Sequence, residues 1–209
     1  MSKKKSPYND TNIELLFDPD IGIDVPKRVI YLSNKTYDSE GEATGVDSKL
    51  ADFVMKSLDY LNHKNTKPIK IALNNPGGYV TDGYAIYDKI ISSKSKIDIY
   101  VYGKAMSMGS IILQAGNKRI LSPNTYILIH DGTMGINSNA KNFESWAEWS
   151  KFERKRMYKL YAQRSGKSEE YWEEKCQNDY ILSAEQAVEE GLADEILGIS
   201  PWAKKLLKK

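Results

Sequence analysis

The chain has 209 residues, of which 41% are hydrophobic and 28% charged, so we expect one soluble domain of ordinary composition. Its formal net charge is only +2, with Lys and Arg spread along the chain, which argues against a nucleic-acid partner. The longest apolar runs are far shorter than the roughly 20 residues that cross a bilayer. We therefore expect no membrane partner.

The two ends of the chain differ from its middle. Residues 1–26 hold Asp, Asn, Pro and Gly without sustained periodicity and are expected to form an N-terminal arm or an irregular lead-in, whereas 201–209 are expected to form a basic C-terminal tail. The start, MSKKKSPYND, lacks the apolar stretch of a signal peptide. Cys176 is the only cysteine, so no internal disulfide can form. These features favour a cytoplasmic protein.

The folded domain, 27–200, begins with strands and helices in alternation. RVIYLS (28–33) predicts a strand, and the polar segment 34–47 predicts a loop. A helix is expected over 48–62, because apolar residues recur there at helical spacing: Leu50, Phe53, Val54, Leu58 and Leu61. PIKIAL (68–73) predicts a second strand. NNPGG (74–78) then breaks the chain before a helix that begins at Val80.

The same order of strand, turn and helix follows again. IDIYVY (97–102) predicts a strand, 103–106 a turn and SMGSIILQAG (107–116) a short apolar helix. Two further strands are expected at 118–122 and 125–130. A long helix over 141–165 and another over 183–191 complete the pattern, the latter with Ser183 and Gln186 as a capping box. Strands that alternate with helices indicate the α/β class.

Ser107 and His130 are the candidate catalytic residues, because Ser107 follows a predicted strand and its turn and His130 ends another predicted strand. In α/β sheets functional groups gather at the carboxyl ends of the strands. A serine at a helix N-terminus is often only an N-cap, but Ser107 stands between Gly103 and Gly109, which leave room for another backbone. His130 closes an apolar strand, whereas His63, the other histidine, is expected on the surface. The pair supplies a nucleophile and a base.

Acyl transfer also needs hydrogen-bond donors for an oxyanion and an acid that orients the imidazole. In NNPGG, Gly77 and Gly78 can offer unobstructed N–H groups, although a plain tight turn is equally compatible. The N–H of Met108 would point toward whatever the hydroxyl attacks. No phosphate-binding glycine motif occurs in the sequence. Among the 28 carboxylates, spacing alone does not identify the orienting acid.

Four segments, in this order, resemble the signatures of the proteolytic subunit of the Clp protease family: NNPGGYVTDGYAIYDKI, GKAMSMGS, ILIHDG and NDYILSAEQAVEEGLADEIL. The resemblance covers roughly residues 68–198. It implies that Ser107 is the nucleophile, His130 the general base and Asp179 the orienting acid. It also implies an oxyanion hole formed by Gly78 and Met108.

The resemblance implies a fold and partners as well. The fold would be the ClpP/crotonase-like spiral of strand-strand-helix units with a long protruding helix. The subunits would form a homo-oligomer of stacked rings, and an ATP-dependent AAA+ unfoldase would supply unfolded polypeptide to its chamber. No cofactor and no metal are required. The chain departs from the family at Asp131-Gly132, where Gln-Pro is usual, and over 1–67, so a divergent or phage-type member is expected.

Three alternatives remain open at this point. A crotonase-fold acyl-CoA enzyme would use the same glycine turns but has no role for the serine, histidine and aspartate. A serine-lysine peptidase would use Lys104, three residues before Ser107. An inactive ring subunit or assembly scaffold would explain the changed residues after His130.

Overall fold

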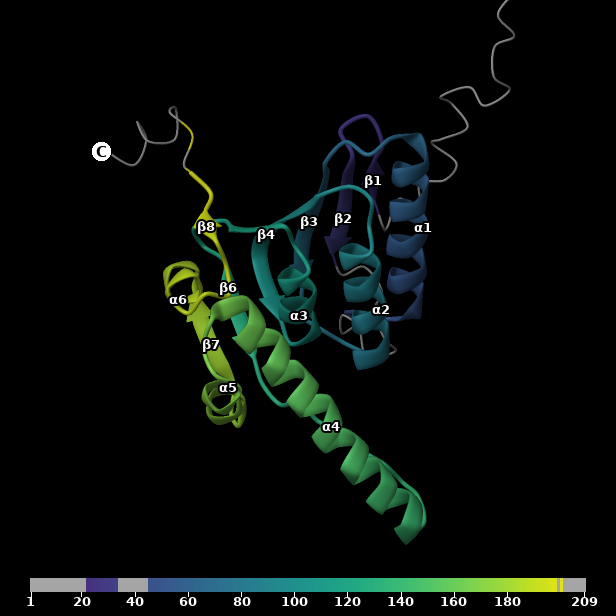
Figure 1. Cartoon of the computed structure of the whole chain (residues 1–209), viewed down its shortest axis with the longest axis vertical. Helices are drawn as coiled ribbons and strands as arrows, with labels where there is room; N and C mark the ends of the chain where they lie inside the picture. Colours follow the sequence, from purple (N-terminus) through teal and green to yellow (C-terminus); the bar gives the residue numbers. More distant parts are fainter. Residues whose placement is uncertain (1–21, 34–44, 199, 201–209) are drawn as a thin grey trace, which may run out of the picture.

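The computed structural model describes residues 22–33, 45–198 and 200 of the chain (Figure 1). Most of the predicted N-terminal arm, most of the predicted loop over 34–47 and the basic tail lie outside the described residues.

The described residues form eight strands and six helices, which confirms the expected α/β class. The strands are β1 (Ile23–Asp24), β2 (Val29–Ser33), β3 (Ile69–Asn75), β4 (Ile97–Met106), β5 (Lys118–Leu121), β6 (Tyr126–Ile129), β7 (Tyr180–Ser183) and β8 (Glu195–Ile196). The helices are α1 (Ser48–Lys64), α2 (Val80–Ile91), α3 (Met108–Gln114), α4 (Ala140–Ser165), α5 (Glu169–Cys176) and α6 (Ala184–Glu189).

The strands form one sheet with the order β1-β2-β3-β4-β5-β8, and β6 joins it by pairing with both β4 and β7. The pairs from β2 to β5 are parallel, as is the pair of β4 and β6. The pairs β1 with β2 and β6 with β7 are antiparallel. Parallel strands bring their carboxyl ends to the same edge of the sheet, which is where Ser107 and His130 lie.

The turn predicted over 103–106 is wrong, because β4 continues through these residues to Met106. Its first part pairs with β5 over Asp98–Val101, and its last part pairs with β6 over Lys104–Met106. Between the two parts Gly103 has a φ of +86°, which bends the strand without ending it. The strand therefore changes partner at Gly103 and carries Ser107 to the end of β6.

Four elements were not expected from the sequence: β1, α5, β7 and β8. All are short, and β1 lies within the segment expected to be an arm. The helix predicted over 183–191 is α6, and its capping box is confirmed, because Ser183 and Gln186 exchange side-chain hydrogen bonds with each other's backbone. Ser183 also ends β7, so strand and helix meet at this residue.

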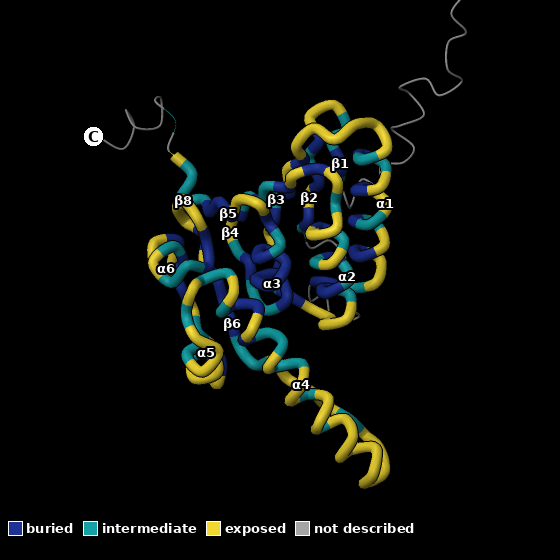
Figure 2. Tube along the Cα trace, in the orientation of Figure 1, coloured by how far each residue is buried: buried dark blue, intermediate teal, exposed yellow. Residues whose placement is uncertain are grey.

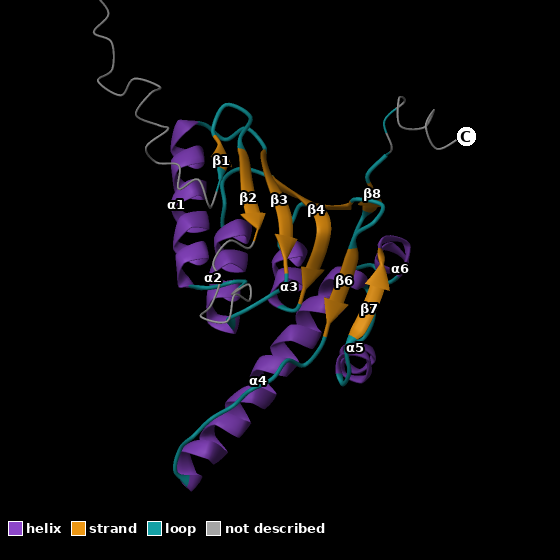
Figure 3. Ribbon diagram, turned by 180° about the vertical axis from the view of Figure 1, so that it is seen from behind, coloured by secondary structure: helices purple, strands orange, loops and turns teal. Residues whose placement is uncertain are grey.

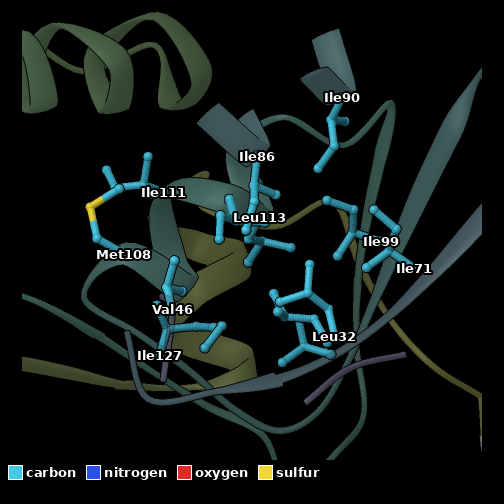
Figure 4. Close-up of a cluster of buried hydrophobic side chains, with 14 of the residues drawn as sticks. Leu32, Val46, Ile71, Ile86, Ile90, Ile99, Met108, Ile111, Leu113 and Ile127 are labelled. Atoms are coloured by element: carbon cyan, nitrogen blue, oxygen red, sulfur yellow. The ribbon is translucent and has the colours of Figure 1, made fainter. Parts of the chain in front are cut away.

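One hydrophobic core lies between the sheet and the helices α1, α2 and α3, which cover one of its faces (Figures 1 and 3). Ile71 and Ile99 project from neighbouring strands toward Ile86 of α2 and Leu113 of α3 (Figure 4). These side chains are fully buried. Burial of this kind contributes about 1.5–3 kcal/mol for each large aliphatic side chain and holds α3, with Ser107 at its start, against the strand ends.

Helix α4 protrudes from this body, as the family resemblance implied (Figure 1). Its second half packs on the body through Tyr158, Leu160 and Tyr161, which are buried, whereas its first half is exposed (Figure 2). The exposed half carries four large aromatic residues that leave about half of their surface in solvent: Phe143, Trp146, Trp149 and Phe152. None of the helices in the described part of the chain is long and apolar enough to cross a membrane.

Candidate active site

Ser107 occupies the sharp junction between β4 and α3. Its φ of 50° and ψ of −121° place it in a region that side-chain-bearing residues rarely adopt. Its N–H donates to the carbonyl of Leu128 on β6 at 2.8 Å, which fixes the junction to the neighbouring strand. The hydroxyl makes no capping hydrogen bond to α3, so the simple N-cap interpretation is wrong. The strained backbone instead presents the side chain at the strand ends.

His130 lies directly beyond β6 and contacts Ser107. The parallel pairing of Met106 with Leu128 brings the ends of β4 and β6 together. His130 Nε2 is 3.0 Å from Ser107 Oγ, which is hydrogen-bonding distance.

Asp179 contacts the other side of the same imidazole, with its Oδ1 at 3.1 Å from His130 Nδ1. The cause is the antiparallel pairing of β6 with β7, which sets Ile129 opposite Tyr180 and so places the residues beside them together. The Asp179 side chain is 63% exposed and that of His130 is 28% exposed, so this edge of the site is open to solvent. Ser107, His130 and Asp179 thus form one hydrogen-bonded chain of side chains.

Asp131, which follows His130 directly, has different partners. Its carboxylate accepts a hydrogen bond from Tyr158 Oη at 2.5 Å and lies 3.6 Å from Arg154 Nε. Burial raises the pKa of Tyr158, and the hydrogen bond to Asp131 raises it further, so the phenol stays protonated as a donor. Both partners come from α4, so Asp131 anchors the segment after His130 to that helix.

The loop Asn75–Gly78 packs against the Ser107 junction. A Cβ added at Gly77, whose φ is +101°, would lie 2.6 Å from Ser107 Cβ, so only glycine allows this approach. Asn75 Oδ1 accepts the Gly77 N–H at 2.8 Å and holds the turn. On the far side, Val46 N donates to the Gly77 carbonyl and Tyr79 N donates to the Val46 carbonyl.

Val46 and Gly78 form a parallel bridge in which Val46 bonds to the residues on either side of Gly78, so the N–H of Gly78 points away from Val46. The N–H of Met108 belongs to the first turn of α3, where no intrahelical acceptor exists. Within the described ranges, neither N–H donates to a protein acceptor. Two free backbone donors are therefore available beside Ser107 for a group that carries negative charge.

A family model for Clp protease matches residues 42–200, which is most of the chain. The chain belongs to the Clp protease family. The match includes every candidate site residue, from Gly78 to Asp179, and the α/β fold agrees with it. The protein is thus a ClpP-like peptidase by family, which sets aside the crotonase-type alternative. Residues 22–33, with β1 and β2, lie before the matched segment.

Lys104, the base in the serine-lysine alternative, lies on β4 and pairs with Tyr126 of β6. Among the described residues, it makes no hydrogen bond to Ser107, whose hydroxyl contacts His130 instead. The same described part of the chain holds no group of three or more His, Cys, Asp or Glu side chains that could bind a metal ion.

Two residues that shape the site were missed by sequence reasoning. Val46 holds Gly78 in an isolated bridge, but nothing in the local sequence distinguishes it from other valines. Asn75 is fully buried and serves as the turn acceptor for Gly77. An asparagine two residues before a glycine is a usual signal for such a turn, so Asn75 could have been found.

Proposed function

We propose that the protein is a serine endopeptidase in which Ser107 is the nucleophile, His130 the general base and Asp179 the acid that orients the imidazole. The hydrogen-bonded chain Ser107–His130–Asp179 is the observation that carries this proposal. It links a hydroxyl, an imidazole and a carboxylate in the order that nucleophilic acyl transfer needs.

In the proposed reaction, Ser107 Oγ attacks the carbonyl carbon of a peptide bond while His130 Nε2 takes the hydroxyl proton. The resulting oxyanion is stabilised by the N–H groups of Gly78 and Met108. His130 then gives its proton to the leaving amine, which produces an acyl-enzyme on Ser107. A water molecule, activated by the same imidazole, hydrolyses this ester and restores the serine.

Hydrolysis of short fluorogenic peptides tests the proposal. The purified protein should cut them, and Ser107→Ala should lower the rate by several powers of ten, as the removal of a catalytic serine does elsewhere. Activity that survives in Ser107→Ala at the parent rate would exclude Ser107 as the nucleophile. A parent protein without activity would favour the inactive ring subunit or scaffold.

We also propose that the subunits assemble through the exposed half of α4. Phe143, Trp146, Trp149 and Phe152 lie there on a helix that protrudes from the body (Figure 2). Trp149 and Phe152 contact each other with ring centroids 5.1 Å apart. Large apolar patches of this kind are usually covered by a partner. A second copy of the chain, in stacked rings that enclose a chamber, is the partner that the family suggests.

We further propose that an ATP-dependent unfoldase supplies the substrate. The sequence has no P-loop motif. A folded domain is held by about 5–15 kcal/mol, which the subunit has no evident means to overcome. The purified subunit should therefore cut short peptides and leave a stable folded reporter intact, with or without ATP. Rapid loss of the reporter without ATP would show an open site and contradict the chamber.

A further inference from the structure

A pair of buried hydroxyls connects α4 to the backbone of Ser107. Ser110 Oγ lies 2.6 Å from the Ser107 carbonyl oxygen and 2.6 Å from Tyr161 Oη. A carbonyl only accepts, so the Ser110 hydroxyl donates its single proton to Ser107. The Tyr161 hydroxyl must then donate to Ser110 Oγ. The result is a directed chain from Tyr161 through Ser110 to the Ser107 carbonyl.

Both hydroxyls are shielded from water. Ser110 and Tyr161 are fully buried, and Tyr161 packs against Trp172 of α5 with ring centroids 5.4 Å apart. Burial raises the pKa of Tyr161 well above its ordinary value, so the phenol keeps its proton at any working pH. Because water cannot replace a lost partner at this depth, these two side chains fix the direction of the hydrogen bonds from Tyr161 to the Ser107 carbonyl.

The Ser107 carbonyl belongs to the same peptide unit as the Met108 N–H. This peptide is trans and planar, so its C=O and N–H point in opposite directions. The carbonyl accepts the N–H of Ser110 at 2.9 Å and that of Ile111 at 3.3 Å, besides the Ser110 hydroxyl. Any group that fixes the direction of this carbonyl therefore also fixes the direction of the Met108 N–H.

We propose that Tyr161, acting through Ser110, is a positioning residue that aims the Met108 N–H at the oxyanion of the transition state. The proposal rests on the proposed function, because it assigns that N–H to the oxyanion hole. The Ser107 backbone is strained, with a φ of 50°, so its peptide unit needs support from its surroundings. The two hydroxyls provide that support, Ser110 from α3 and Tyr161 from α4, the helix proposed to carry the assembly surface.

The test compares the steady-state kinetics of peptide hydrolysis in Tyr161→Phe, Ser110→Ala and the double variant. A misdirected oxyanion donor weakens binding of the transition state but not of the substrate. Tyr161→Phe should therefore lower kcat by about tenfold with KM unchanged, a smaller loss than removal of a donor outright. The double variant should be no slower than Ser110→Ala, because Tyr161 acts through Ser110.

Tyr171→Phe is the matched control, since it removes a tyrosine hydroxyl that binds Glu190, away from the Ser107 peptide. It should leave kcat within about twofold of the parent. Melting curves show whether each variant folds. If Tyr161→Phe does not fold, Ser110→Ala still tests whether kcat depends on the hydrogen bond to the Ser107 carbonyl.

A kcat for Tyr161→Phe within about twofold of the parent would overturn the inference, as would losses that add in the double variant. Failure of the proposed function is a different outcome, because the parent protein itself would then show no hydrolysis that depends on Ser107.

Discussion

Asp179 Oδ1 lies 3.1 Å from His130 Nδ1, although 49 positions separate the two residues in the chain. The antiparallel pair β6 and β7 creates this contact, because it aligns Ile129 with Tyr180. Asp131, by contrast, is adjacent to His130 in sequence but binds Tyr158 and Arg154. The two carboxylates thus have different partners, because Asp179 contacts the imidazole and Asp131 contacts α4.

This difference predicts opposite outcomes for two matched substitutions. Asp179→Asn should keep the fold and the assembly but lose about 10⁴-fold in kcat, because an amide favours the wrong imidazole tautomer. Asp131→Asn removes the same charge from the neighbouring position and should retain most of the activity. Peptide hydrolysis by both variants, with melting curves, checks the pair. Loss of activity in Asp131→Asn alone would mean that Asp131 is the orienting acid.

The proposed assembly surface on α4 predicts a change of oligomeric state. Trp149→Glu places a charge among exposed aromatic residues, so it should yield smaller species in native mass spectrometry. Peptide hydrolysis should fall with the assembly, although Trp149 is remote from Ser107 in the fold. Asn142→Glu is the control, because it adds the same charge to the same exposed half of α4 without removing an aromatic ring. A parent protein that is a fully active monomer would contradict the proposal.

The ion pair of Arg119 and Asp194 predicts how stability depends on pH. Arg119 is buried, and it donates to Asp194 through both its backbone and its side chain. Burial by itself would raise the pKa of Asp194, but the hydrogen bonds from Arg119 outweigh it and hold this pKa below its ordinary value. The carboxylate therefore stabilises the fold above the unfolded-state pKa of about 4 and loses this contribution as the pH falls through the lower folded-state pKa.

Asp194→Asn should consequently destabilise the protein at about pH 7, by about 1–3 kcal/mol, with the lower end favoured because Asp194 is partly exposed. Near pH 3 the difference in unfolding free energy between Asp194→Asn and the parent should shrink, since the parent carboxylate begins to take up a proton there. Chemical denaturation of both proteins at both pH values measures this difference. An equal difference at the two pH values would show that the charge of Asp194 contributes nothing.

The sequence predicted much of this site because parallel strands align their ends. Ser107 and His130 each stand at the end of an apolar strand, so the pattern predicted that both lie at one edge of the sheet. Their direct contact depends on the pairing of β4 with β6, which the pattern did not predict. The spacing did not identify Asp179, because its position depends on β7, a four-residue strand with no clear alternation, and only the family resemblance pointed to it.

The continuation of β4 through Gly103 was likewise missed, because a glycine that follows an apolar strand is usually a turn signal. The support of the Ser107 peptide by Tyr161 was also not predictable. It depends on where α4 packs, and no local pattern encodes that packing.

The most direct test of Ser107 as the nucleophile is labelling with a serine-reactive phosphonate, followed by peptide mapping in a mass spectrometer. One covalent adduct is expected, on Ser107 of the parent protein, because His130 lies 3.0 Å from this hydroxyl and is proposed to activate it. The adduct should form far more slowly in His130→Ala and be absent in Ser107→Ala. An adduct on a different serine, or a Ser107 that does not react while the protein still hydrolyses peptides, would show that Ser107 is not the nucleophile.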